Sequence, residues 1–138
     1  MTPEQAAGVM AKAVAYTGQY LDENAPRAWA EALTGVDFTD ACRAVANLGS
    51  RPAEPGKVTP ILPGNVIWEV QRIRAQRVAD FDASKADPPP GLTAREYIDW
   101  LRGQRALAAS GKPLDAMPAL EQRPAPGVIA QLRKRWSV

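Results

Sequence analysis

The chain contains no histidine, and Cys42 is its only cysteine. The absence of histidine excludes histidine-based catalytic triads and the common zinc sites, while a lone cysteine excludes an internal disulfide. Cys42 lies in the segment DACRAVANL, at a position that a helix would bury. We interpret it as a small core residue rather than a nucleophile, because free cysteine packs well in cores and no histidine is present to activate it.

The chain also lacks a Gly-x-x-x-x-Gly-Lys-Ser/Thr phosphate-binding loop, a recognisable signal peptide, and any apolar run long enough to cross a bilayer. Several carboxylates lie at junctions between expected helices, where capping accounts for them without catalysis. These are Asp22, Glu23, Asp37 and Asp40. We therefore expect a cytoplasmic protein that is not an enzyme, holds no metal or other cofactor, and contacts neither a membrane nor a small-molecule substrate.

The net charge of +2 is unevenly distributed along the 138 residues. Residues 1–50 carry three basic and six acidic side chains, whereas residues 93–138 carry eight basic and four acidic ones. This bias is weaker than the dense basic patch expected of a dedicated nucleic-acid-binding protein. The charge distribution alone therefore does not indicate nucleic-acid binding.

Three helices with local start and stop signals are expected in the first part of the chain. Thr2-Pro3-Glu4-Gln5 forms a capping box with a proline in the first turn, and the apolar face that follows continues to about residue 21. A short second helix is expected over residues 26–33, with Trp29 in the core. Asp37 can cap a third helix, for which Gly49 is a suitable C-terminal stop.

The stretch Pro60–Asp82, PILPGNVIWEVQRIRAQRVADFD, predicts a fourth helix that begins at Pro63, after a loop over residues 50–62. Its apolar residues recur at helical spacings and would form one stripe. They are Val66, Ile67, Val70, Ile73, Val78 and Phe81. Two interpretations stay open for this helix: a core helix with a solvated arginine edge, or a contact surface formed by the arginines and Trp68.

The region after residue 82 begins with a proline-rich spacer. Three consecutive prolines favour an extended, semi-rigid segment, so we place a domain boundary at about residue 83. Thr93-Ala94-Arg95-Glu96 is another capping box, and a fifth helix is expected over residues 94–109. Its apolar residues are widely spread, so the helix either docks on the bundle or presents Trp100 to a partner.

A second proline-rich segment leads to the C-terminal sequence GVIAQLRKRWSV. Its apolar residues have helical spacing beside a basic cluster, which predicts a short amphipathic partner-binding segment. The residues expected to contact the partner there are Val128, Ile129, Leu132, Arg133, Lys134, Arg135 and Trp136. A frayed tail, or a helix folded back on the core, is the alternative.

These patterns predict an all-α fold in three parts. Residues 1–82 form a small four-helix bundle, residues 83–92 a proline-rich linker, and residues 93–138 a helical region with the amphipathic basic tail. No element of this scheme requires bound metal or nucleotide. The arrangement is typical of an adaptor that binds other macromolecules.

The order of several short motifs in the chain resembles that of a known protein family and indicates which class of partner to expect. Trp29-(x)3-Leu33, the pairs Asp40-Ala41 and Ala44-Val45, the segment Leu62-Pro63-Gly64-Asn65-Val66-Ile67, and a helix bearing Arg72 and Arg77 follow one another in the chain. Over residues 3–82 this order resembles the bacteriophage replicative-helicase loader/inhibitor family. The resemblance implies a small helical N-terminal domain, a flexible C-terminal part that engages a hexameric bacterial helicase, and loading or inhibition of that helicase during DNA replication without catalysis by this chain.

The alternative function is DNA binding. The unit from Phe38 to Asp82 resembles a helix-turn-helix arrangement in which Arg72, Arg74 and Arg77 would face a groove of the duplex. The connection between its two helices is much longer than the usual tight turn, and the acidic first part of the chain would repel phosphates. We therefore expect a helicase as the main partner and at most a weak DNA contact.

Overall fold

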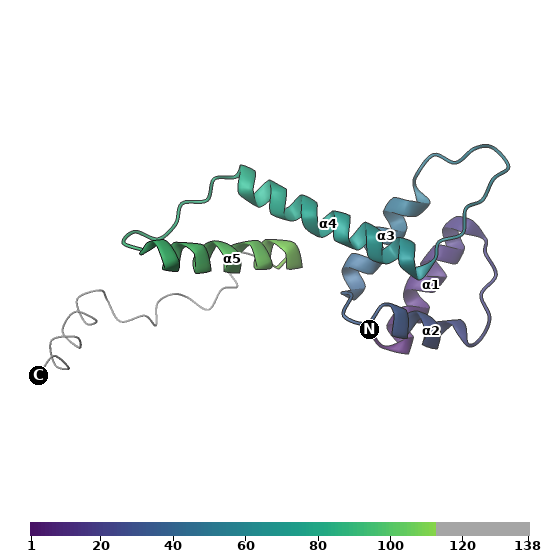
Figure 1. Ribbon diagram of the computed structural model, residues 1–138. Coiled ribbons are helices and arrows are strands. Elements are labelled where there is room, and N and C mark those ends of the chain that lie inside the picture. Colours follow the sequence, from purple (N-terminus) through teal and green to yellow (C-terminus); the bar gives the residue numbers. More distant parts are fainter. Residues whose placement is uncertain (113–138) are drawn as a thin grey trace, which may run out of the picture.

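The computed structural model describes residues 1–112 and contains five α-helices and no strand within that range. The all-α prediction is therefore confirmed. The helices are α1 (Pro3–Thr17), α2 (Ala25–Ala32), α3 (Phe38–Gly49), α4 (Pro63–Ala83) and α5 (Ala94–Ser110). Figure 1 shows α1, α2 and α3 gathered around one end of α4, while α5 runs beside the other end. No helix within residues 1–112 is long and apolar enough to cross a membrane.

The first helix starts as expected but ends earlier. Thr2 Oγ1 accepts a hydrogen bond from the Gln5 N–H at 3.2 Å, and Gln5 Oε1 accepts one from the Thr2 N–H at 3.1 Å. Gly18 ends the helix because its φ of 65° lies in the left-handed region, which other residues adopt at a cost. The expectation that the apolar face continues to about residue 21 was wrong, and Tyr20 is 90% exposed.

One hydrophobic core lies between α1, α2, α3 and the first half of α4. The buried residues of this core are Ala6, Val9, Met10, Ala13, Trp29, Ala30, Leu33, Ala41, Ala44, Val45, Ile61, Val66, Val70 and Ile73. The prediction that Trp29 belongs to the core is confirmed, since only 5% of it is exposed. Cys42 is half-buried at the edge of the core rather than inside it, and this burial raises the pKa of its thiol.

Gly49 has a different role from the one expected of it. It is the last residue of α3, and the cap that follows is Ser50 in a right-handed helical conformation. A side chain at position 49 would collide with the ring of Tyr16 on α1. The glycine is therefore needed for the close approach of the two helix ends and not for a left-handed stop.

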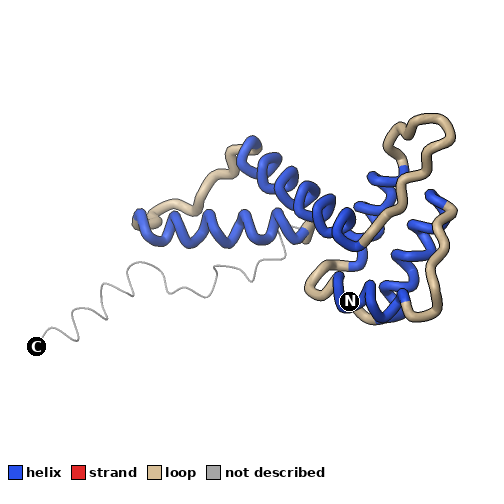
Figure 2. The backbone as a smooth tube through the Cα atoms, turned by 45° about the vertical axis from the view of Figure 1, so that its right-hand side comes forward, coloured by secondary structure: helices blue, strands red, loops and turns tan. Residues whose placement is uncertain are grey.

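The apolar stripe of α4 is divided between two partners. Val66, Val70 and Ile73 are buried in the core, and Ile67 packs against it. Phe81 is buried outside that core, in the half of α4 along which α5 packs. One helix thus joins the bundle to a projecting hairpin made of α4 and α5 (Figure 2).

The hairpin is offset, so that half of α5 extends past the end of α4. Arg77 Nη1 donates to the Ala109 carbonyl at 3.1 Å, and Arg105 Nε donates to Asp82 Oδ1 at 2.9 Å. These antiparallel pairs place the end of α4 opposite the middle of α5. Residues 94–103 therefore lie beyond α4, beside the proline-containing connection (Figure 1). The contacts of α5 with α4 cross the boundary expected at residue 83, and the division into separate domains stays a prediction.

Candidate functional site

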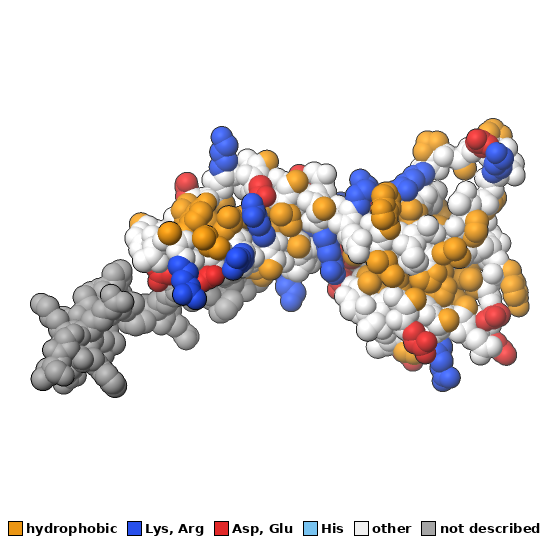
Figure 3. Space-filling model, in the orientation of Figure 1, with side chains coloured by type: hydrophobic (Ala, Val, Ile, Leu, Met, Phe, Trp, Pro, Cys, Tyr) orange, Lys and Arg blue, Asp and Glu red, His pale blue; other side chains and the backbone are white. Residues whose placement is uncertain are grey.

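Two rows of polar side chains face each other across the contact of α3 with α4. Arg43, Asn47 and Arg51 follow one another at four-residue intervals along α3 and just past its end. Trp68 and Arg72 are likewise four residues apart on α4, which places them on one side of that helix. Together with Glu69, these five residues form what we call the α3–α4 strip. Figure 3 shows basic side chains beside an apolar one where the two helices meet.

Glu69 is the centre of the α3–α4 strip, and its carboxylate is fully buried. Arg72 donates to it from Nη2 at 2.7 Å and from Nε at 3.2 Å, Asn47 donates at 3.0 Å, and Arg51 forms a short ion pair. The hydrogen bonds from Arg72, followed by that from Asn47 and the charge of Arg51, lower the pKa of Glu69, although burial acts in the opposite direction. A single carboxylate thus holds two guanidinium groups in place.

Trp68 is the exposed aromatic residue of the strip, with 56% of its surface accessible. The Arg51 guanidinium lies over its ring, 5.6 Å from the centroid, at a cation–π distance. Beside these residues is a hollow of about 230 Å³ between α3 and α4. Its lining comprises Arg43, Asn47, Arg72, Ile73, Gln76, Arg77 and Asp80. The strip therefore offers an aromatic face next to a hollow lined by three arginines.

Asp40 is a second buried carboxylate, and it binds two other arginines of α4. Arg77 donates to its two oxygens at 2.6 and 3.1 Å, and Arg74 Nε lies 3.5 Å from Oδ2. Arg77 also donates to the Ala109 carbonyl, and its guanidinium packs against Gly111. Arg77 thereby connects α3, α4 and α5. Capping at a helix junction was the expected role of Asp40, and its burial against α4 is a finding of the structure.

The three arginines expected to contact DNA do not form one free group. Arg72 pairs with Glu69, whereas Arg74 and Arg77 pair with Asp40. Their side chains are 54%, 39% and 22% exposed, in that order. The pairing leaves less uncompensated charge for duplex phosphates than the sequence indicates. The DNA contact by these residues stays a prediction.

The projecting half of α5 presents a second surface, which we call the α5 overhang, residues 94–103. Tyr97 is 41% and Ile98 48% exposed, and the ring of Tyr97 stacks on half-buried Trp100 with centroids 6.0 Å apart. Trp100 was expected to contact a partner, and the structure places it beside these two residues. Tyr97 and Ile98 were not named as site residues, although the wide spread of apolar positions along this helix was a visible signal for them.

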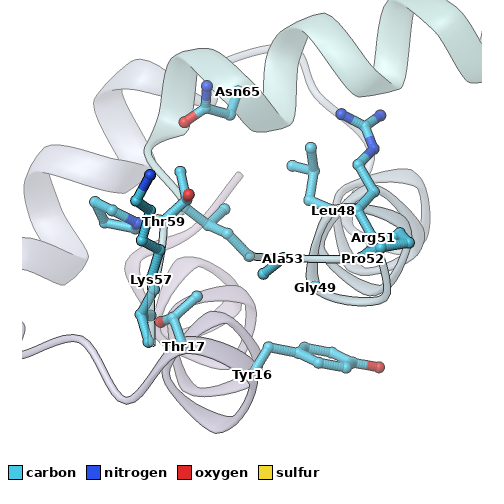
Figure 4. A pocket seen from close by; sticks show the side chains of 13 residues that line it. Tyr16, Thr17, Leu48, Gly49, Arg51, Pro52, Ala53, Lys57, Thr59 and Asn65 are labelled. Atoms are coloured by element: carbon cyan, nitrogen blue, oxygen red, sulfur yellow. The ribbon is translucent and has the colours of Figure 1, made fainter. Parts of the chain in front are cut away.

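A third feature is a pocket of about 380 Å³ between the ends of α1 and α3 and the loop over residues 50–62 (Figure 4). Tyr16, Arg51 and Lys57 contribute to its lining. The side-chain amide of Gln19 fixes the loop, because it donates to the Ile61 carbonyl at 3.0 Å and accepts from the Ile61 N–H at 2.7 Å. The lining contains neither a carboxylate nor a cysteine, so it offers no carboxylate base and no nucleophilic thiol.

Within residues 1–112, no group of three or more carboxylates and cysteines is placed to hold a metal ion. The tail residues expected to bind a partner lie outside the described residues. They are Val128, Ile129, Leu132, Arg133, Lys134, Arg135 and Trp136. Within residues 1–112, the α3–α4 strip and the α5 overhang both place exposed aromatic side chains beside charged ones.

Comparisons of the chain with protein families, curated proteins and solved structures give no match.

Proposed function

We propose that this chain is a non-enzymatic adaptor that binds a bacterial replicative helicase and loads or inhibits it during phage DNA replication, in the cytoplasm of the host cell. The observation that supports an adaptor is the α5 overhang. It places an exposed tyrosine, an exposed isoleucine and a half-buried tryptophan on a helix that extends beyond its neighbour.

The overhang has the properties of a helix that a partner groove receives. Tyr97 and Trp100 are three residues apart and stack, so one side of the helix carries a continuous aromatic surface. Aromatic residues supply much of the binding energy at protein interfaces. Arg95 and Arg102 lie near this surface together with Glu96 and Asp99, so the overhang combines its aromatic side chains with a polar edge that has no net charge.

The identity of the partner rests on the resemblance of residues 3–82 to helicase loader/inhibitor proteins. In this proposal the bundle carries the α4–α5 hairpin, and the overhang and the C-terminal tail both contact the helicase. Two linked contacts would bind more tightly than either alone, because the second forms at a high effective concentration. Leu132 and Trp136 are the tail residues expected to matter most.

Binding to purified replicative helicase tests the proposal. A double variant, Tyr97→Ala with Ile98→Ala, should weaken binding by tenfold or more, since truncation of an aromatic hot spot costs about 2 kcal/mol or more. Tyr20→Ala is the matched control, because Tyr20 is an exposed tyrosine outside the hairpin. Equal affinities of the double variant and the control would contradict a role for the overhang.

The tail is tested separately in the full chain. Replacing Leu132 and Trp136 by alanine should greatly weaken helicase binding, because these side chains would fill an apolar groove. Replacing Arg133, Lys134 and Arg135 should mainly slow association and reduce its dependence on salt. If the basic substitutions instead abolish binding to duplex DNA and the apolar ones change nothing, the partner is DNA and the helicase proposal is wrong.

A further inference from the structure

The α3–α4 strip has a surplus of positive charge in a part of the chain that has none overall. Residues 1–112 contain thirteen basic and thirteen acidic side chains. The strip contains Arg43, Arg51 and Arg72 against the single carboxylate of Glu69. Arg43 is exposed and has no ion-pair partner within residues 1–112. Asp80, at the edge of the neighbouring hollow, accepts a hydrogen bond from Gln76. The strip is therefore a local site of attraction for anions.

Two of the three arginines of the strip, Arg51 and Arg72, are held in position by Glu69 before any ligand arrives. Arg72 uses Nε and Nη2 to bind Glu69, which leaves its remaining nitrogen, Nη1, for another acceptor. Its side chain is still 54% exposed. Because the buried carboxylate fixes the guanidinium, little side-chain entropy would be lost when Arg72 binds an anion. Arg72 therefore keeps a free nitrogen and an exposed side chain for an anion, although Glu69 offsets part of its charge.

Trp68 gives the strip a preference for flat, aromatic ligands, which its positive charge alone would not give. More than half of Trp68 is exposed to water. Exposure of a large aromatic side chain is unfavourable, and folding usually buries such a side chain. The nearby guanidinium of Arg51 makes the site both aromatic and cationic. Nucleic-acid bases stack on such side chains, and the adjacent phosphates bind arginine.

We propose that the α3–α4 strip binds single-stranded nucleic acid, with one base stacked on the face of the Trp68 ring that Arg51 does not cover and the adjoining phosphates held by Arg43 and Arg72. A duplex is a poorer ligand, because its bases are already stacked and would have to be flipped out to reach Trp68. An acidic peptide would satisfy the arginines but would leave the tryptophan without a flat partner. This site lies on the bundle, away from the α5 overhang, and does not depend on the helicase proposal.

Fluorescence anisotropy with a labelled oligothymidylate about 16 nucleotides long, at the upper end of common site sizes, provides the test in the full chain. Trp68→Ala should weaken binding roughly 5- to 150-fold, as expected for one lost base stack, whereas Trp68→Phe should retain most of it. Arg43→Ala should lower the slope of log K against log salt by about 0.7, because one phosphate contact is lost. Tyr20→Ala and Arg27→Ala are the aromatic and basic controls, because both residues are exposed and lie outside the strip and the overhang, and both variants should bind as the wild type does.

Several results would overturn the inference. The assignment of the binding site to the strip is wrong if the wild type does not bind the oligonucleotide, or if Trp68→Ala and Arg43→Ala bind it as the wild type does. Competition by an acidic peptide as effective as that by unlabelled oligothymidylate would assign the strip to a protein partner, and a duplex that binds equally well would exclude base stacking. The helicase proposal is judged by the Tyr97 and Ile98 variants, so either proposal can fail without the other.

Discussion

Replacing Arg77 by methionine should remove the polar contacts that connect α3, α4 and α5 and should destabilise the protein. Methionine keeps an unbranched apolar stem but removes the guanidinium that binds Asp40 and the Ala109 carbonyl. The carboxylate of Asp40 is 3% exposed and would be left with Arg74 at 3.5 Å. An uncompensated buried charge would then oppose folding.

The size of the expected loss of stability follows from the burial of Arg77 and Asp40. Breaking a buried pair by removing one member typically costs about 3–5 kcal/mol. Because 22% of the Arg77 side chain is exposed and Arg74 stays near the carboxylate, we expect a loss of about 2–4 kcal/mol in the free energy of unfolding. This is a large share of the roughly 5–15 kcal/mol that stabilises a typical domain.

Urea unfolding followed by circular dichroism measures the effect. Arg102→Met is the matched control, because Arg102 lies 3.9 Å from Asp99 and both side chains are mostly exposed. That control should change stability by less than about 0.5 kcal/mol. In the double variant with Asp40→Asn, part of the loss should be recovered, because the buried charge is removed along with its partner. Strictly additive losses, or equal losses in Arg77→Met and Arg102→Met, would refute this reasoning.

Three further predictions follow from the core and from the pKa shifts. Trp29→Ala should cost about 3–5 kcal/mol in thermal or urea unfolding, since it empties a buried site, and a loss below 1 kcal/mol would contradict its burial. Because its pKa is lowered in the folded protein, Glu69 contributes stability above its ordinary pKa of 4.5, and this contribution is lost as pH falls through the pKa of the folded state. The stability of Glu69→Gln should therefore depend less on acid pH than that of the wild type. An unchanged pH profile would contradict the ion pairs of Glu69 with Arg51 and Arg72. Cys42 should react slowly with a thiol reagent at neutral pH and much faster in urea, because burial raises its pKa, and equal rates in the two conditions would show an exposed thiol.

Helix positions could be predicted because their signals are local. Thr2, Asp37 and Thr93 each accept a hydrogen bond from the N–H three residues later, as the sequence around each of them indicates. Gly18 was overlooked as a stop, although its position directly after Thr17 was a usable signal. Apolar periodicity alone cannot show where a helix ends when apolar residues continue into the next loop.

The polar networks could be predicted only in part. Glu69 lies three residues after Val66 and one before Val70, so its place within the apolar stripe was a signal that a carboxylate is buried there. Its partners Asn47 and Arg51 come from another helix, and a single sequence does not reveal such pairings. For the same reason the sequence grouped Arg72 with Arg77, whereas the structure assigns them to different carboxylates.

The position of α5 depends on its register against α4. The capping box at Thr93 gives its start, and proline residues give a separation from α4. The offset that leaves residues 94–103 beyond the end of α4 depends on where Arg77 meets Ala109 and where Asp82 meets Arg105. Local patterns cannot fix such contacts, so the sequence identified Trp100 as a candidate contact but not the surface around it.

Hydrogen–deuterium exchange of the full chain, with and without saturating replicative helicase, tests the central claim most directly. Backbone amides in residues 94–103 should exchange more slowly in the complex while those of α1 and α2 stay unchanged, because in the proposed complex the overhang is the described part of the chain that contacts the helicase. Absence of protection in residues 94–103, or protection confined to the bundle, would contradict the claim that this protein binds a helicase through the projecting half of α5.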